Sequence, residues 1–248
     1  MPQNQVNNAI YDQYGDRWYT AYDDPVALLR AEAKLKNPWI QQKIEDRFAE
    51  PVDILDIGCG GGFLSNFLSE KGHRVTGVDL SGESLAVARR HDRTQTARYI
   101  EADAYQLPFA DSSFDVITAM DFLEHVEDPA KVIQEAARVL RPGGLFFFHT
   151  FNRNWISYIV VIKMVEWLVR NAPEDMHVLR LFVKPSEARK YCQSSGLEVQ
   201  EMKGIKPVFS SIPVKNVFTG VVPTAMRFEF TKSLLLSYIG YATKPYLS

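Results

Sequence analysis

The sequence predicts an α/β fold built on a parallel sheet, and three observations support this. Short apolar segments alternate with helical segments through the middle of the chain, a pattern typical of βαβ units. A turn with four glycines, Gly58-Cys-Gly-Gly-Gly62, follows the first apolar segment. Acidic residues stand at the ends of several later segments. The carboxyl ends of parallel strands meet at one edge of a sheet, where ligands bind, so we expect the site there.

The composition is that of a globular protein and argues against nucleic-acid binding and against a disulfide-stabilised fold. The 248 residues are 46% hydrophobic and 23% charged, which suffices for one large domain with a sizeable core. The net charge is -2 and no basic run occurs, so nucleic acid is not an expected partner. Two cysteines, Cys59 and Cys192, are too few for a disulfide framework. The N-terminus has no signal-peptide pattern, and we expect a cytoplasmic protein.

Residues 1–48 are expected to form an aromatic arm, which packs against another part of the molecule, and a helix. Residues 1–25 are polar and aromatic, whereas disordered segments are poor in aromatic residues. Pro25 begins a helical pattern that reaches about Phe48, with apolar residues near one face.

Residues 50–150 are expected to form the ligand-binding core. The predicted strands are residues 52–57, 74–79, 98–101, 114–120 and 145–148. The predicted helices are residues 63–71, 83–90 and 129–140. Gly72 ends the first of these helices, and the run Arg141-Pro-Gly-Gly144 stops the last.

Residues 151–182 are predicted to be an apolar helical insertion. The stretch 155–170 is short for a membrane span and contains Lys163 and Glu166. It is a core helix or dimer face, or else a lid that contacts a hydrophobic substrate and a membrane surface. In the second case Ile159 and Ile162 are expected to contact the apolar part of the substrate.

Residues 183–248 return to the sheet. A helix at 185–195 is followed by a strand at 197–202, and the run 226–241 is expected to include a last strand. Because no internal repeat or low-complexity linker occurs, residues 1–248 are expected to be a single domain.

The glycine-rich turn indicates a ligand that comes close to the backbone. Gly58 and Gly60 follow the acidic Asp56, and a glycine has no Cβ to obstruct a ligand. A dinucleotide-binding fingerprint needs another glycine where this chain has Phe63. A nicotinamide oxidoreductase is therefore an alternative that this position disfavours.

The acids at the next strand ends suit an adenosine group. Asp79 ends the second strand, where a carboxylate can accept from both ribose hydroxyls; alternatively it caps the next helix, a role that Ser81 can also fill. Asp103 follows the third strand and can accept from the exocyclic amine of adenine.

These residues resemble the class I S-adenosylmethionine-dependent methyltransferases. The matching segments are Asp56-Ile-Gly-Cys-Gly-Gly-Gly62, Gly77-Val-Asp79, Asp103-Ala104, Phe114-Asp-Val-Ile117 and Leu140-Arg-Pro-Gly-Gly144. The resemblance implies a Rossmann-like fold, with a mostly parallel seven-stranded sheet and helices on both faces. It also implies S-adenosyl-L-methionine as the cofactor. Such a sulfonium donor needs no metal ion, because the enzyme mainly aligns the reacting atoms.

The same resemblance implies a set of cofactor contacts. Gly58 and Gly60 flank the methionine part and Asp79 binds the ribose. The remaining implied cofactor residues are Asp56, Leu80, Asp103, Ala104 and Met120.

The acceptor is expected to be a small hydrophobic molecule. No Asn-Pro-Pro-Tyr follows the fourth strand and neither cysteine follows a proline, so two nucleic-acid or protein methylation motifs are missing. The rest of the chain is similar to the ubiquinone-biosynthesis O-methyltransferases, which act on polyprenylated catechols. The segments that carry this similarity are Asn152-Arg153, the apolar insertion, the His177 region, Lys184-Pro-Ser-Glu187 and Gly204-Ile205.

This second resemblance implies O-methylation of a phenol or catechol, such as a polyprenylated quinone precursor. It also matches Arg30 with an arginine that contacts the cofactor carboxylate. Two positions depart from the family pattern: His149 replaces a small hydroxylated residue, and Asp121 replaces a commoner glutamate. C- or N-methylation of another small molecule and a non-catalytic cofactor-binding module are the alternatives.

Two histidines are candidates for the general base that takes the phenolic proton. His125 follows the fourth strand, and imidazole titrates near neutral pH; in the alternative interpretation it only caps a short helix. His149, at the end of the fifth strand, is the second candidate. Asp121, Glu124 and His125 also have the spacing of a divalent-metal site on one helix face. Prenyl length and oligomeric state do not follow from the sequence.

Overall fold

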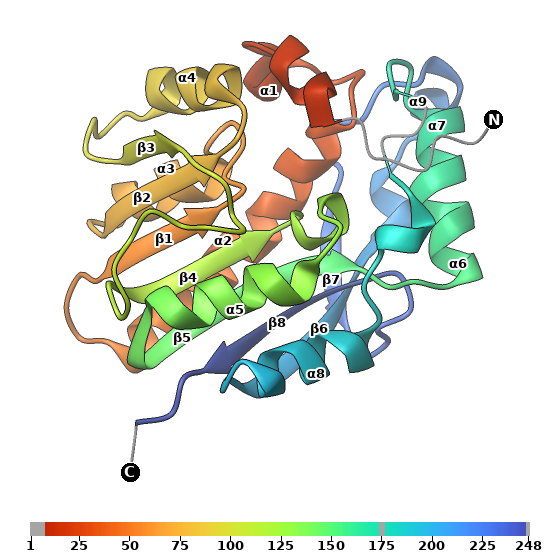
Figure 1. The fold of residues 1–248 in the computed structure, drawn as a ribbon. Coiled ribbons are helices and arrows are strands. Elements are labelled where there is room, and N and C mark those ends of the chain that lie inside the picture. Colours follow the sequence, from red (N-terminus) through yellow and green to blue (C-terminus); the bar gives the residue numbers. More distant parts are fainter. Residues whose placement is uncertain (1–7, 174–176, 247–248) are drawn as a thin grey trace.

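The computed structural model describes residues 8–173 and 177–246 and has a central eight-stranded sheet that is covered by helices (Figure 1). The strand order is β3-β2-β1-β4-β5-β8-β6-β7. The five strands from β3 to β5 run parallel, and β8, β6 and β7 are joined by antiparallel pairing. The predicted class I α/β fold is therefore confirmed.

The elements have the following bounds. The strands are β1 (Asp53–Ile57), β2 (Arg74–Asp79), β3 (Arg98–Glu101), β4 (Phe114–Met120), β5 (Leu140–Phe151), β6 (Glu198–Pro207), β7 (Phe228–Thr231) and β8 (Ser237–Thr243). The α-helices are α1 (Arg17–Thr20), α2 (Val26–Arg47), α3 (Phe63–Glu70), α4 (Gly82–His91), α5 (Pro129–Val139), α6 (Trp155–Ser157), α7 (Met164–Leu168), α8 (Pro185–Ser194) and α9 (Val214–Thr219). The short helical turns are η1 (Asn8–Gln13), η2 (Leu123–His125), η3 (Tyr158–Lys163), η4 (Leu179–Leu181) and η5 (Phe209–Ser211).

The expected seven strands are one too few, because the run 226–241 contains two strands. The missed strand is β7, which lies at the edge of the sheet and pairs with β6. Its residues alternate, with Phe228 and Phe230 packed on the core and Glu229 exposed. Such alternation indicates a strand even over four residues.

Two other strands are longer than predicted. β5 begins at Leu140, so the Arg141-Pro-Gly-Gly144 run belongs to the strand instead of a connecting loop. The pairing register of β4 with β5 shifts at this run, which accommodates the two glycines as an irregularity. β6 continues to Pro207, five residues beyond its expected end at residue 202.

Both faces of the sheet are buried, which explains the continuous apolar run in β5. Phe146 and Phe148 face the core under α5 and α8, whereas Phe147 faces the core under α2 and α3. All three side chains are fully buried. Strands covered on both faces read as unbroken apolar runs.

The apolar insertion is helical over residues 155–168, where α6, η3 and α7 follow one another without a gap and the middle stretch η3 is a π-helix. Its side chains divide between two environments: Val161 and Ile162 are buried, whereas Trp155 and Ile159 are 70% and 42% exposed. Among the described residues, no helix is both long and apolar enough to cross a membrane.

Candidate functional site

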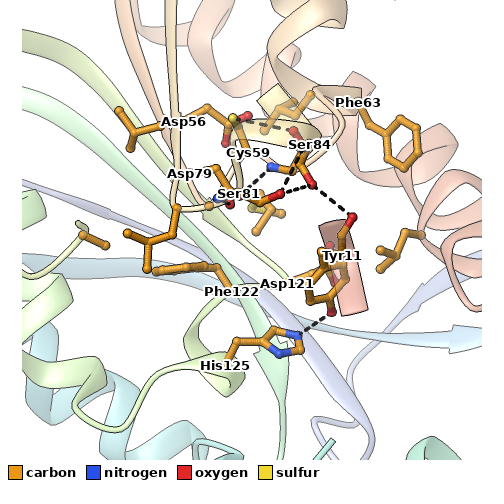
Figure 2. Close-up of a pocket in the computed structure, with 18 of the residues that line it drawn as sticks. Tyr11, Asp56, Cys59, Phe63, Asp79, Ser81, Ser84, Asp121, Phe122 and His125 are labelled. Atoms are coloured by element: carbon orange, nitrogen blue, oxygen red, sulfur yellow. Dashed lines mark hydrogen bonds between the residues drawn. The ribbon is translucent and has the colours of Figure 1, made fainter. Parts of the chain in front are cut away.

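Two neighbouring cavities lie at the carboxyl edge of the parallel strands. The first cavity has a volume of about 380 Å³ and lies above the ends of β1, β2 and β4, with the N-terminal arm over it (Figure 2). Most of the candidate residues predicted from the sequence line the wall of this cavity. Those residues are Asp56, Gly58, Gly60, Asp79, Leu80, Asp103, Ala104, Met120 and His125. The first cavity therefore unites the candidates from four successive strand ends.

Gly58 and Gly60 adopt left-handed backbone conformations, with φ of 68° and 50°. A Cβ at Gly58 would overlap the ring of Phe122, and one at Gly60 would lie 2.9 Å from Trp18. The glycines are thus needed for the backbone conformation and for two aromatic rings of the wall. Their role is broader than the expected clearance for a ligand.

Asp79 is held by the backbone of two turns. Its carboxylate accepts one hydrogen bond from the Gly60 amide and one from the Ser81 amide, each 2.9 Å long. Burial raises the pKa of Asp79. The cap of α4 is Ser81, whose hydroxyl accepts from the Ser84 amide. Each carboxylate oxygen of Asp79 can accept a further bond, so the orientation is set while acceptor capacity is kept.

Asp56 joins three elements beneath the glycine turn. Its carboxylate accepts from the hydroxyls of Ser65 and Thr118, both at 2.6 Å. Burial raises the pKa of Asp56 to about 6. The side chain thus ties β1 to α3 and β4 and supports the turn that carries the glycines.

The second cavity, of about 420 Å³, is walled mostly by apolar side chains of α2, the insertion and the β6–β7 region. Val161 and Val165 of the insertion line it. Ile159 and Ile162 do not, because Ile159 is exposed and Ile162 packs against Phe182. The two side chains expected from the sequence to contact an apolar substrate therefore lie outside the wall of this cavity.

The two cavities meet at a junction of four residues. Tyr11, Leu29, Asp121 and His125 belong to both walls. His125 Nε2 lies 3.3 Å from the Tyr11 hydroxyl, and the His125 ring also contacts that of His177 at 5.4 Å between centroids. Burial lowers the pKa of His125 to about 4, so its imidazole is neutral at pH 7.

A buried ionic cluster of Glu32, Lys36, Asp121 and His149 lies beside the junction. The Asp121 carboxylate contacts Lys36 Nζ at 2.5 Å and His149 Nδ1 at 2.6 Å, and Lys36 also reaches Glu32 at 3.0 Å. Burial would raise the pKa of Asp121, but the charges of Lys36 and His149 outweigh it and hold this pKa well below its usual range. Asp121 has a φ of 53°, a strained conformation that often marks a functional position.

His149 and Arg30 lie outside the wall of the first cavity. His149 is fully buried and belongs to the ionic cluster. Asp121 and His149, the two residues expected to depart from the family pattern, contact each other. The Arg30 guanidinium donates to the backbone carbonyls of Trp18 and Ala21, so it ties α2 to the N-terminal arm.

The carboxylates and imidazoles group differently from the metal site suggested by the spacing of Asp121, Glu124 and His125. Among the described residues, the ligand atoms that lie within 4.8 Å of one another are those of Glu32, Asp121 and His149. Lys36 bonds to both of these acids, so a lysine already supplies positive charge to the group. Glu124 lines the second cavity, and burial together with the charge of Asp121 raises its pKa to about 8.

Reasoning from the sequence missed Lys36 and Glu32. Their i,i+4 spacing on α2 was the available signal, since a glutamate and a lysine so placed pair on a helix. The contact of Lys36 with Asp121 had no local signal, because the packing of α2 against the end of β4 creates it.

Comparison with known proteins gives a consistent picture. Residues 55–148 match a family described as a methyltransferase domain. A ubiquinone biosynthesis O-methyltransferase of Methylococcus capsulatus is 33% identical over 99% of this chain and 98% of its own length. One from Actinobacillus pleuropneumoniae serotype 7 is 38% identical over 81% of this chain and 89% of its own length. A solved SAM-dependent methyltransferase from Methanosarcina mazei shares the fold, with a TM-score of 0.59, 24% identity and coverage of 83% and 98% of the two chains.

Proposed function

Because the chain belongs to the family of the ubiquinone biosynthesis O-methyltransferases and is an S-adenosylmethionine-dependent methyltransferase, we propose that it methylates an oxygen of a hydrophobic phenol or catechol. A polyprenylated quinone precursor is an acceptor of this kind. One observation carries the proposal: an apolar cavity meets the first cavity at a junction that contains an imidazole and a carboxylate.

The residues of the first cavity fit S-adenosyl-L-methionine. Asp79 has an oriented carboxylate for the ribose hydroxyls, and Asp103 with Ala104 lies in the wall for the adenine. Gly58 and Gly60, which line the same cavity, would lie against the methionine part. When bound, the cofactor supplies an electrophilic methyl group on a sulfonium. Arg30 is not proposed as a contact, since its guanidinium is engaged by the arm.

The acceptor is proposed to place its apolar tail in the second cavity and its hydroxyl at the junction. Val161, Val165 and Val169 offer apolar contact for the tail. The exposed Trp155 and Ile159 on the same insertion suit contact with a membrane surface, where a prenylated acceptor resides.

His125 is proposed as the group that takes the phenolic proton. Its ring lines both cavities and is neutral at pH 7, so a nitrogen lone pair is available as the oxygen–carbon bond forms. Asp121 lines both cavities as well. Its carboxylate can stabilise the imidazolium that results, and His149 with Lys36 positions Asp121.

The test is a methyl-transfer assay with a panel of acceptors. We expect O-methyl product from a prenylated catechol, with a lower kcat/KM for a short catechol and none for amines or carbon acids. Product on nitrogen or carbon would replace the proposal with N- or C-methylation. His125→Gln is expected to lower kcat by about 10²–10⁴-fold, the contribution of a general base, while the Kd for S-adenosylmethionine is retained.

A further inference from the structure

The Tyr11 side chain lies at the junction of the two cavities. Its hydroxyl is 3.3 Å from His125 Nε2, and the two rings meet edge to face with centroids 5.6 Å apart (Figure 2). Tyr11 belongs to the walls of both cavities. A phenol group of the protein therefore hydrogen-bonds the proposed base at the point where acceptor and cofactor must meet.

A tyrosine side chain and the acceptor have the same reactive group. We propose that the Tyr11 hydroxyl occupies the place where the acceptor's hydroxyl group binds. The acceptor phenol displaces Tyr11 and forms the hydrogen bond to His125 Nε2 in its stead. This inference rests on the proposed function, because it needs a phenolic acceptor. It adds to the proposed function a subsite for a neutral phenol whose ring lies edge-on to His125. It also names Tyr11 as the residue that competes with the acceptor for this subsite.

The charge state of Tyr11 fits this role. Burial, with the nearby acids adding to it, raises the pKa of Tyr11 well above its ordinary value, so the hydroxyl keeps its proton. In the tautomer with the imidazole proton on Nδ1, the Tyr11 hydroxyl donates to Nε2. A neutral acceptor phenol can make the same bond, and its proton then passes to Nε2 during methyl transfer.

The arm has two separate attachments, so that Tyr11 can leave without unfolding the site: α1 is anchored on the glycine turn and on α2, whereas η1 is held to α4 by hydrogen bonds from the hydroxyls of Ser81 and Ser84. Trp18 is 4% exposed and packs over the glycine turn, and Arg30 binds the backbone at Trp18 and Ala21. Gly15 lies between Tyr11 and this anchor with a φ of 47°, and among the described residues no atom outside its chain neighbours lies within 4 Å of the place where a Cβ would stand. Rotation near Gly15 would move η1 and leave α1 in place.

The test variant is Tyr11→Phe, which removes only the hydroxyl group. It retains the ring and its stacking on Trp18, whose ring centroid lies 5.7 Å from that of Tyr11. The matched control is Tyr14→Phe. Tyr14 is a buried tyrosine of the same arm that packs on Tyr11 and Trp18, and it lines neither cavity.

Two measurements are made on the full chain with a prenyl-substituted catechol. The first is calorimetric binding of the catechol to protein saturated with S-adenosylhomocysteine, which needs no turnover. The second is steady-state methyl transfer. We expect Tyr11→Phe to bind the catechol about two- to tenfold more tightly and to lower its KM likewise, the value of one neutral hydrogen bond. Tyr14→Phe should match the wild type in both measurements.

Equal or weaker catechol binding by Tyr11→Phe would overturn the subsite, as would a lower kcat with unchanged KM, which would make Tyr11 a positioning residue. The two proposals fail separately. If the wild type methylates catechols and Tyr11→Phe binds them no better, the subsite is wrong and the function stands. If catechols bind Tyr11→Phe more tightly but are never methylated, the subsite stands and the proposed function is wrong.

Discussion

Lys36 is the cation of the buried ionic cluster, and Lys36→Met removes its charge while keeping an unbranched apolar chain. The ammonium lies 3.0 Å from Glu32 and 2.5 Å from Asp121, and the Lys36 side chain is 3% exposed. Loss of one partner from a buried ion pair costs about 3–5 kcal/mol, because the other charge is left uncompensated. We expect the free energy of unfolding to fall by about that amount at pH 7.5.

The deficit should depend on pH, and its sign follows from Asp121. In the wild type Lys36 and His149 depress the pKa of Asp121, so the stability from this carboxylate is present above its unfolded pKa of about 3.9. That stability is lost only as the pH falls toward the folded pKa. Without Lys36, only His149 opposes the effect of burial, so the pKa of Asp121 is higher than in the wild type. In the variant, proton uptake by Asp121 then removes its uncompensated charge. The loss in free energy of unfolding relative to the wild type should therefore shrink as the pH falls from 7.5 to 5.

The measurement is urea unfolding followed by circular dichroism at pH 7.5, 6 and 5. The control is Lys206→Met, which breaks a surface pair with Glu229 whose side chains are about half exposed; it should cost at most about 1 kcal/mol at every pH. A cost below about 1 kcal/mol for Lys36→Met, or a deficit independent of pH, would refute the reasoning.

Three further predictions concern the two cavities. Asp79→Ala should weaken S-adenosylmethionine binding by about 1.5–3 kcal/mol, since charge-assisted bonds to the ribose are lost; an unchanged Kd by calorimetry would contradict the ribose role. Val161→Ser should raise the activation barrier for a prenylated catechol, measured from kcat/KM, by about 1–3 kcal/mol and affect a short catechol much less; equal losses for the two acceptors would contradict the placement of the tail. Because burial raises the pKa of Glu124 to about 8, its stabilising contribution is present at low pH and is lost as the pH rises toward 8. Glu124→Gln should flatten that part of the stability–pH profile in urea titrations, and an unchanged slope would contradict the raised pKa.

Local signals predicted the fold and the first cavity well. The bounds of β2, β3 and β4 agree with the predicted ranges 74–79, 98–101 and 114–120, because apolar runs end at turn residues. The residues that follow parallel strands share one edge, so Asp79 and Asp103 could be placed in one wall before any coordinates were known.

The ionic cluster had no such signal. Asp121 departs from regular backbone at φ 53°, and nothing in its neighbours along the chain specifies this. Its partners Lys36 and His149 are brought to it by the packing of α2 and by the pairing of β4 with β5. Arg30 illustrates the same limit, because the folded arm, not the helix that carries Arg30, decides where its guanidinium binds.

The two cavities draw on different parts of the chain, and this gives the protein a modular construction. Among the described residues, the wall of the first cavity takes none beyond Val126. The wall of the second takes only Asp121, Glu124 and His125, which follow β4, from the core between β1 and β5, and otherwise uses residues up to Glu32 or from Phe151 onward. Grafting residues 151–237 of a relative onto this chain should therefore exchange the acceptor while the affinity for S-adenosylmethionine is inherited unchanged.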